Sequence, residues 1–115
     1  MLTIAETSVF SAIWPNYWTA EEFGDFCFWL AFHPEAGDVI PQSGGCRKVR
    51  WSVAGRGKRG GVRVIYFNRL ADGTVWLMPM YAKNVRADVD ASVLVKLKET
   101  LDGKTQRKGA SKVRG

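Results

Sequence analysis

Cationic side chains and glycines are concentrated between Gly44 and Arg63. This stretch of twenty residues holds seven Lys or Arg, six Gly and no acid. Arginine has a planar guanidinium group that fits a phosphate, and lysine supplies a compact charge. Glycine lets the backbone approach a phosphate closely. The first forty-three residues contain six acids and no Lys or Arg, so charge is sorted along the chain. The segment therefore predicts a surface for a polyanion, and nucleic acid is the favoured partner.

The same composition would also suit a solvated hairpin loop that binds phosphates without catalysis, and composition leaves both interpretations open. The run GRGKRGG at residues 55–61 is not a Walker motif, because its spacing differs and no Ser or Thr follows the lysine. We therefore do not expect nucleotide hydrolysis. If the site cuts nucleic acid, RNA is favoured, because its 2′-OH supplies the nucleophile and cleavage then needs a base, an acid and cations on the phosphate.

Metal and cofactor chemistry is not expected. The chain has one histidine, His33, and two cysteines, Cys27 and Cys46, which are too few for a metal cluster or a disulfide framework. We expect both thiols to be free. The longest apolar run, Phe26–Phe32, is too short to span a membrane, and the N-terminus lacks the pattern of a secretion signal. The expected location is the cytoplasm, with no membrane partner.

The order of elements predicts an α+β domain with an antiparallel-dominated sheet, flanked by N-terminal helices and a C-terminal helix. A Thr19–Glu22 capping box begins the second helix, and Asp90 is the expected N-cap of the last one. Residues 1–102 would form this domain, and the basic tail at 103–115 is expected to be disordered. The expected strands are 2–6, 47–53, 62–70 and 74–82, and the expected helices are 8–14, 19–33 and 87–101.

Alternation along the strands separates the side chains into two faces. Val49 lies on the face opposite Lys48 and Arg50, and Val62, Val64 and Tyr66 alternate with Arg63 and Ile65. Arg63 is therefore expected to be held by a strand and aimed in advance, whereas 55–61 is expected to be a loop. Rings that could stack on unpaired bases are those of Tyr66, Tyr81 and Trp51.

The second predicted helix is apolar on more than one side. Phe23, Phe26, Cys27 and Leu30 make one stripe, while Phe28 and Phe32 lie nearly opposite. We expect the preceding segment, with Phe10, Ile13 and Trp14, to cover this second face. The alternative is an interface with a partner protein.

Four segments together resemble a known protein family. They are GDVI at 37–40, SGGCRKVRW at 43–51, GRGKRGGVRVIYF at 55–67 and MYAKN at 80–84. In order and spacing they are similar to the HigB-type branch of the RelE/ParE toxin superfamily, over residues 2 to 101. The resemblance implies a RelE-like fold, a type II toxin–antitoxin system, and metal-free cleavage of mRNA at the ribosomal decoding site. It also implies a cognate helix-turn-helix antitoxin that blocks the toxin.

By position in these segments, the resemblance implies a catalytic role for Arg63 at the scissile phosphate, assisted by Lys83 and Lys58. No tyrosine stands between Arg86 and Asp90, where RelE has a tyrosine that stacks on mRNA, so Tyr81 or Tyr66 would have to substitute and the general base is unassigned. The superfamily also contains ParE-like toxins that poison DNA gyrase without cutting RNA, and this alternative remains open, as does a degenerate toxin kept as a repression partner. The residues expected to bind RNA are Arg47, Lys48, Arg50, Arg56, Arg59, Tyr66 and Tyr81, with Lys58 in the same loop.

Overall fold

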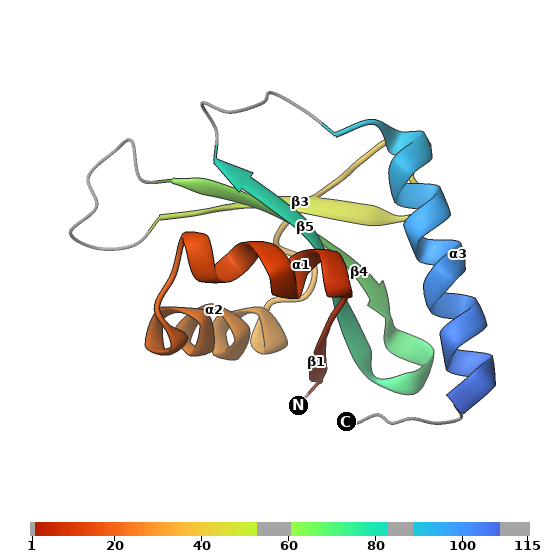
Figure 1. Cartoon of the computed structure of the whole chain (residues 1–115), viewed down its shortest axis with the longest axis horizontal. Coiled ribbons are helices and arrows are strands. Elements are labelled where there is room, and N and C mark those ends of the chain that lie inside the picture. Colours follow the sequence, from red (N-terminus) through yellow and green to blue (C-terminus); the bar gives the residue numbers. More distant parts are fainter. Residues whose placement is uncertain (1, 53–60, 83–88, 109–115) are drawn as a thin grey trace.

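A computed structural model describes residues 2–52, 61–82 and 89–108 of the chain. Within these ranges the fold is the predicted α+β arrangement, with helices on both faces of one sheet (Figure 1). Among the described residues, no helix is both long enough and apolar enough to cross a membrane.

Five strands form the sheet in the order β1-β5-β4-β3-β2. β1 runs parallel to β5, and the other neighbouring pairs are antiparallel, which confirms an antiparallel-dominated sheet. β5 is paired on both sides, and its nearly continuous apolar sequence is typical of such a central strand. The strands are β1 (Thr3–Glu6), β2 (Asp38–Val39), β3 (Cys46–Trp51), β4 (Val62–Arg69) and β5 (Thr74–Ala82).

Strand β2 was not predicted. None of the expected elements covers 34–45, but Asp38 and Val39 pair with Lys48 and Arg47 at the edge of the sheet. Two residues are too few to produce a readable alternation, so periodicity does not detect this strand. The strand matters because it borders the site described below.

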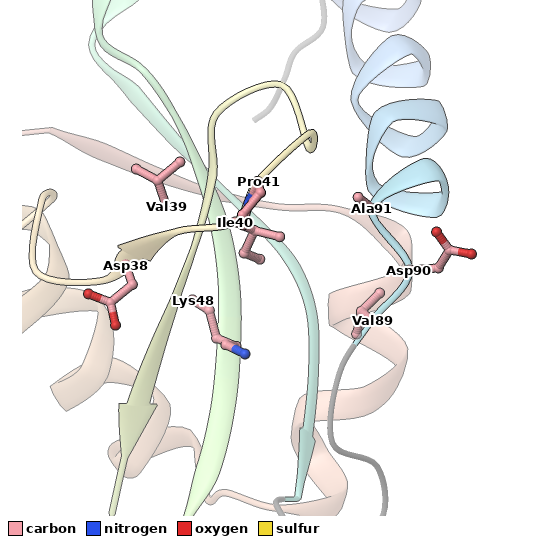
Figure 2. Close-up of a pocket in the computed structure, with 8 residues that line it drawn as sticks. All are labelled: Asp38, Val39, Ile40, Pro41, Lys48, Val89, Asp90 and Ala91. Carbon is pink, nitrogen blue, oxygen red and sulfur yellow. The ribbon is translucent and has the colours of Figure 1, made fainter.

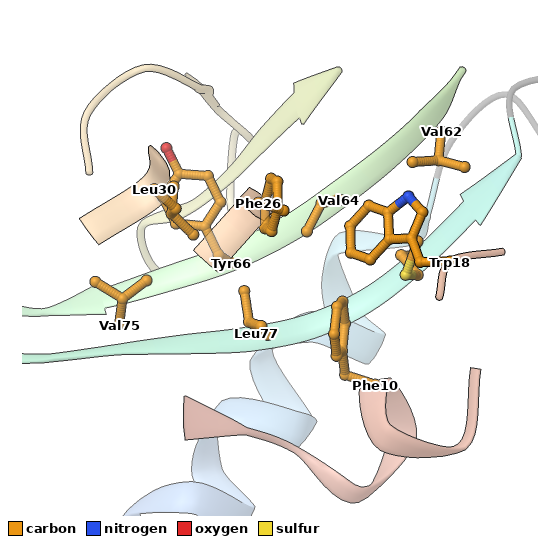
Figure 3. Packing of buried hydrophobic residues seen from close by; sticks show 10 residues of the cluster. Phe10, Trp18, Phe26, Leu30, Val62, Val64, Tyr66, Val75 and Leu77 are labelled. Atoms are coloured by element: carbon orange, nitrogen blue, oxygen red, sulfur yellow. The ribbon is translucent and has the colours of Figure 1, made fainter. Parts of the chain in front are cut away.

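Two helices, α1 (Ser8–Ile13) and α2 (Ala20–Phe32), cover one face of the sheet. The predicted capping box begins α2: the Thr19 hydroxyl accepts a hydrogen bond from Glu22 N–H, and the Glu22 carboxylate accepts one from Thr19 N–H. The core beneath these helices joins Phe10, Trp18 and Phe26 to the apolar side chains of β4 and β5 (Figure 3).

The prediction that the preceding segment covers the second face of α2 is wrong for Phe28 and Phe32. Trp14 stacks on Phe23 with 4.4 Å between ring centroids, so the preceding segment packs near the first stripe. Phe28 and Phe32 remain 64% and 55% exposed. The preceding segment is short, and it is engaged with the sheet-facing side of α2.

Helix α3 (Ala91–Lys108) packs on the other face of the sheet. Leu94 and Leu101 are buried against Cys46, Ile65 and Met78, and the Lys98 ammonium lies 4.9 Å from the centre of the Phe67 ring. The helix continues past its predicted end at 101, so residues 103–108, expected in a disordered tail, are helical. The residues from 102 to 108 include no large apolar side chain, so the extension leaves no apolar period to detect. Residues 109–115 lie outside the described part of the chain.

An irregularity in β5 sets the facing of its last residues. Val64 pairs with Met80 and Tyr66 with Leu77, so Met78 and Pro79 together oppose Ile65 alone. A bulge of this kind tolerates proline, which has no N–H for the ladder. It also reverses the alternation, and Tyr81 therefore shares the α3 side of the sheet with Met78.

Both cysteines are free thiols, as predicted. Burial, with a smaller contribution from the Glu6 carboxylate, raises the pKa of Cys27 from 9.0 to about 12, and burial also raises the pKa of Cys46. Because only the thiolate reacts, both residues should resist iodoacetamide at pH 8 in the folded protein and react at an ordinary rate in urea. Mass spectrometry of timed samples measures this. Rapid labelling of folded Cys27 would contradict the packing described for α2.

Candidate nucleic-acid interface

Three of the predicted cations lie together on the α3 side of the sheet. Lys48 and Arg50 alternate with Val49 on β3, and Arg63 on β4 shares its face with Ile65. Arg50 and Arg63 are direct cross-strand partners, and Tyr81 on β5 is the next partner of Arg63. The strand phasing predicted from the sequence is confirmed here.

The register places the side chains of Arg50 and Arg63 directly opposite each other. Directly opposed residues of an antiparallel pair have Cβ atoms about 4.5–5.5 Å apart, and like charges at that spacing destabilise the sheet. A bound anion between or above the two groups would relieve this repulsion. A phosphate suits the position, because each arginine presents parallel N–H donors to its oxygens.

Two adjoining hollows extend from this pair, and together we call them the basic groove. The first measures about 420 Å³ and is lined by Ala36, Asp38, Lys48, Val49, Arg50 and Arg63. The second measures about 470 Å³ and lies between β2 and the start of α3 (Figure 2). Asp38 and Lys48 belong to both, so the groove leads from the arginine pair to the N-terminus of α3.

Lys48 stands in the middle of the groove. Figure 2 shows its ammonium on the side of β3 turned toward Val89, while the Asp38 carboxylate points away from it. The two residues are cross-strand partners at the edge of the sheet. The groove therefore contains a cation between the arginine pair and the start of the helix.

Asp90 closes the far end of the groove and caps α3, as predicted. Its carboxylate accepts hydrogen bonds of 3.0 Å from both the N–H and the hydroxyl of Ser92. These bonds hold the pKa of Asp90 below its usual value. The cap keeps a negative charge at this end, so an anionic strand would be favoured nearer to Arg50 and Arg63.

Arg47 does not lie in the groove, and its predicted part in RNA binding is corrected. It has the opposite strand phase to Lys48, and its guanidinium donates to the carbonyls of Gly37 at 2.7 Å and Glu35 at 3.3 Å. These contacts hold the connector that leads into β2. The side chain is a structural clamp on the wall of the groove.

The expected stacking roles of Tyr66 and Tyr81 are also corrected. Tyr66 is fully buried, and its hydroxyl accepts a 2.9 Å hydrogen bond from Gly37 N–H. Burial raises the pKa of Tyr66. Tyr81 is 6% exposed and packs with Val89 beneath the start of α3. Neither ring offers a free face to a base.

Trp51, a further stacking candidate, is packed on the opposite side of the sheet. Its ring lies 5.1 Å from Phe26 and 5.0 Å from Trp29 between centroids. Trp51 of β3 and Tyr66 of β4 thus belong to the core under α2. The described part of the groove is lined mainly by cations, carboxylates and small apolar groups.

No protein-family model matches the chain.

Among residues 2–52, 61–82 and 89–108, no three His, Cys, Asp or Glu side chains gather in a group that could hold a metal ion. Lys58, Lys83, Arg56 and Arg59 lie outside these ranges. Arg50 and Arg63 lie close in sequence to residues 53–60, near the strand ends at Trp51 and Val62.

Sequence reasoning missed the residues that shape the groove. Gly37 lies so close to β3 that a Cβ there would stand 2.8 Å from the Lys48 carbonyl oxygen. Asp38 follows it and borders both hollows. The signal available was the GDVI run itself, in which a glycine precedes an acid and two β-branched residues. The three cations of the groove would suit an extended phosphate backbone.

Proposed function

We propose that this protein is the toxin of a type II toxin–antitoxin system, a HigB-type mRNA endoribonuclease that acts on translating ribosomes in the cytoplasm. The observation that supports the proposal best is the strand-held pair of Arg63 and Arg50, in direct register at one end of an open groove. The sequence resemblance described above supplies the reaction and the partner, a helix-turn-helix antitoxin.

The proposed reaction uses the RNA's own nucleophile. The 2′-oxygen attacks the adjacent phosphorus, the bond from phosphorus to the 5′-oxygen breaks, and the products are a 2′,3′-cyclic phosphate and a 5′-hydroxyl. A base takes the proton of the 2′-OH, and an acid returns one to the leaving 5′-oxygen. No cofactor takes part in this scheme.

Arg63 has the central role in this scheme. Negative charge grows on the phosphate oxygens as the 2′-oxygen attacks, and a fixed cation stabilises that charge more than it stabilises the ground state. Arg50 and Lys48 would hold the flanking phosphates in the groove. Lys58 and Lys83 are assigned as assisting cations through the resemblance alone.

The test uses ribosomes translating a defined mRNA. Purified protein should produce new 5′ ends within codons at the decoding site, mapped by primer extension, whereas free mRNA should be cut more slowly. The ends should carry a 5′-hydroxyl, so they should be labelled by polynucleotide kinase without prior phosphatase treatment.

The gyrase-poison alternative gives the opposite pattern. Messenger RNA would stay intact, and the protein would trap gyrase on DNA in a supercoiling assay. That pair of results would replace the endoribonuclease proposal with a binding toxin. A protein that arrests neither translation nor supercoiling would contradict both activities and favour a degenerate toxin kept as a repression partner.

A further inference from the structure

Two phenylalanines on the outer side of α2 remain in solvent. Phe28 and Phe32 are 64% and 55% exposed, and their rings meet edge to face with 5.1 Å between centroids. The inner side of the same helix is well covered, since Phe26 and Leu30 are fully buried. Exposed aromatic pairs of this kind mark interaction sites more often than isolated apolar residues do.

Acidic side chains extend the same side of the helix. Glu21, Asp25, Phe28 and Phe32 follow one another at spacings of four, three and four residues, which places them in one line, and all four are exposed. We call this line the α2 stripe. At 1.5 Å per residue it is about 16 Å long, or three helical turns. Its first half is acidic and its second half is aromatic.

We propose that the α2 stripe docks a basic amphipathic helix of a partner protein. Apolar side chains of that helix would cover Phe28 and Phe32, and its Lys or Arg side chains would lie beside Glu21 and Asp25. Charge complementarity supports this occupant, because both exposed side chains in the first half of the stripe are acidic.

Two other occupants fit the stripe less well. A second copy of this chain, docked through the same surface, would add acids and no base. The chain's own residues 103–115 supply five bases but only one apolar residue beyond alanine, so they offer little to cover two phenylalanines.

The stripe and the basic groove belong to opposite faces of the sheet. α2 packs on the face that carries Val64 and Tyr66, whereas the groove opens on the face that carries Lys48 and Arg63. A docked helix would leave the groove accessible. The inference therefore stands apart from the proposed function, and binding to the stripe can be measured without any cleavage assay.

The probe is a fluorescein-labelled helical peptide of about five turns, built from a leucine stripe and lysines. A second peptide carries glutamate in place of every lysine. The lysine peptide should bind the full-length protein, measured by fluorescence anisotropy, although the protein's net charge of +6 opposes general attraction. The glutamate peptide should bind at least about 10-fold more weakly.

Variants locate the binding on the stripe. Phe28→Ala with Phe32→Ala should weaken lysine-peptide binding by about 10-fold or more, with an unchanged melting temperature because both rings are exposed. Glu21→Lys with Asp25→Lys should weaken it and flatten its salt dependence. Val93→Ala is the matched control, because Val93 is 53% exposed on α3, and it should change nothing.

Several results would overturn the proposal. One is equal binding of the two peptides, and another is unchanged binding by the double phenylalanine variant. A dimer in sedimentation that the same double variant abolishes would assign the stripe to a second copy. A gain in peptide affinity after deletion of residues 109–115 would assign it to the chain's own tail.

Discussion

Replacing Arg63 with alanine should lower the rate of the proposed mRNA cleavage by about 100-fold or more, because the proposed reaction develops charge on the phosphate that Arg63 would contact. Arg63 lies in β4 between two paired strands, with Arg50 and Tyr81 as its direct partners. Pairing on both sides fixes the Cα position of Arg63 at the edge of the groove. Single-turnover cleavage on programmed ribosomes measures the effect.

Three further variants separate catalysis from binding. Arg50→Ala should weaken RNA affinity and make it less sensitive to salt, with a smaller change in the rate at saturation. Arg63→Lys keeps the charge and loses the fork, so its rate should lie between those of the parent and Arg63→Ala. Lys96→Ala removes an exposed cation on α3 and should change neither quantity.

An Arg63→Ala protein that folds normally and cleaves at the parental rate would contradict the catalytic assignment. Equal losses for Arg50→Ala and Arg63→Ala at saturating RNA would instead indicate that the two arginines act together on one phosphate. Urea unfolding of each variant is the necessary control. Removing either charge from a like-charged pair should leave stability unchanged or raise it slightly.

Strand phasing was the most informative property of the sequence. Alternation over 47–53 and 62–70 placed Arg63 on the same face as Ile65, and the structure confirms that face as the one beneath α3. The capping box at Thr19 and the cap at Asp90 were also predicted correctly. Each of these features depends on residues close together in sequence, where periodicity and hydrogen-bonding pattern act directly.

The prediction that Tyr66 stacks on bases was wrong for a reason that the sequence already contained. Alternation puts Tyr66 in phase with Val62 and Val64, on the face opposite Arg63, so one solvent-facing site could not include both. For Tyr81 the bulge at Pro79 brings the ring onto the same face as Arg63, and packing with Val89 beneath α3 buries it there. Register irregularities arise from pairing with a neighbouring strand, and a single strand's pattern does not contain them.

The wall of the groove could not be predicted because its contacts join distant segments. Arg47, Tyr66 and Asn68 each hold the connector at 34–37, through the carbonyls of Pro34, Glu35 and Gly37 and the N–H of Gly37. Tyr66 is 29 residues from the glycine it binds. Composition identified the cations of this region, but the clamp that positions them follows only from tertiary packing.

Replacing Tyr66 with alanine should have the largest effect on stability, a loss of about 3–5 kcal/mol in the free energy of unfolding, since the ring is fully buried. Tyr66→Phe keeps the ring and removes only the hydroxyl that accepts from Gly37 N–H. It should cost about 1–3 kcal/mol, because a buried donor is left without its partner. Urea denaturation at neutral pH measures both values.

The substitution Gly37→Ala disturbs the contact between Gly37 and Tyr66 from the side of the connector. Its new Cβ would stand 2.8 Å from the Lys48 carbonyl oxygen and 3.0 Å from the Tyr66 hydroxyl, and the first of these atoms is backbone that cannot turn aside. The connector must then move away from β3, taking Asp38 with it and opening the groove beside Lys48. The variant should therefore lose both stability and RNA affinity.

The contrast between two glycines makes this prediction specific. A Cβ at Gly24, on the exposed side of α2, meets nothing within 4 Å, so Gly24→Ala should leave RNA affinity unchanged and raise stability slightly. If Tyr66→Phe and Gly37→Ala lose stability but bind RNA normally, the clamp serves only folding. If both weaken RNA binding at temperatures where they are fully folded, the clamp positions the groove, because neither substitution removes a charge.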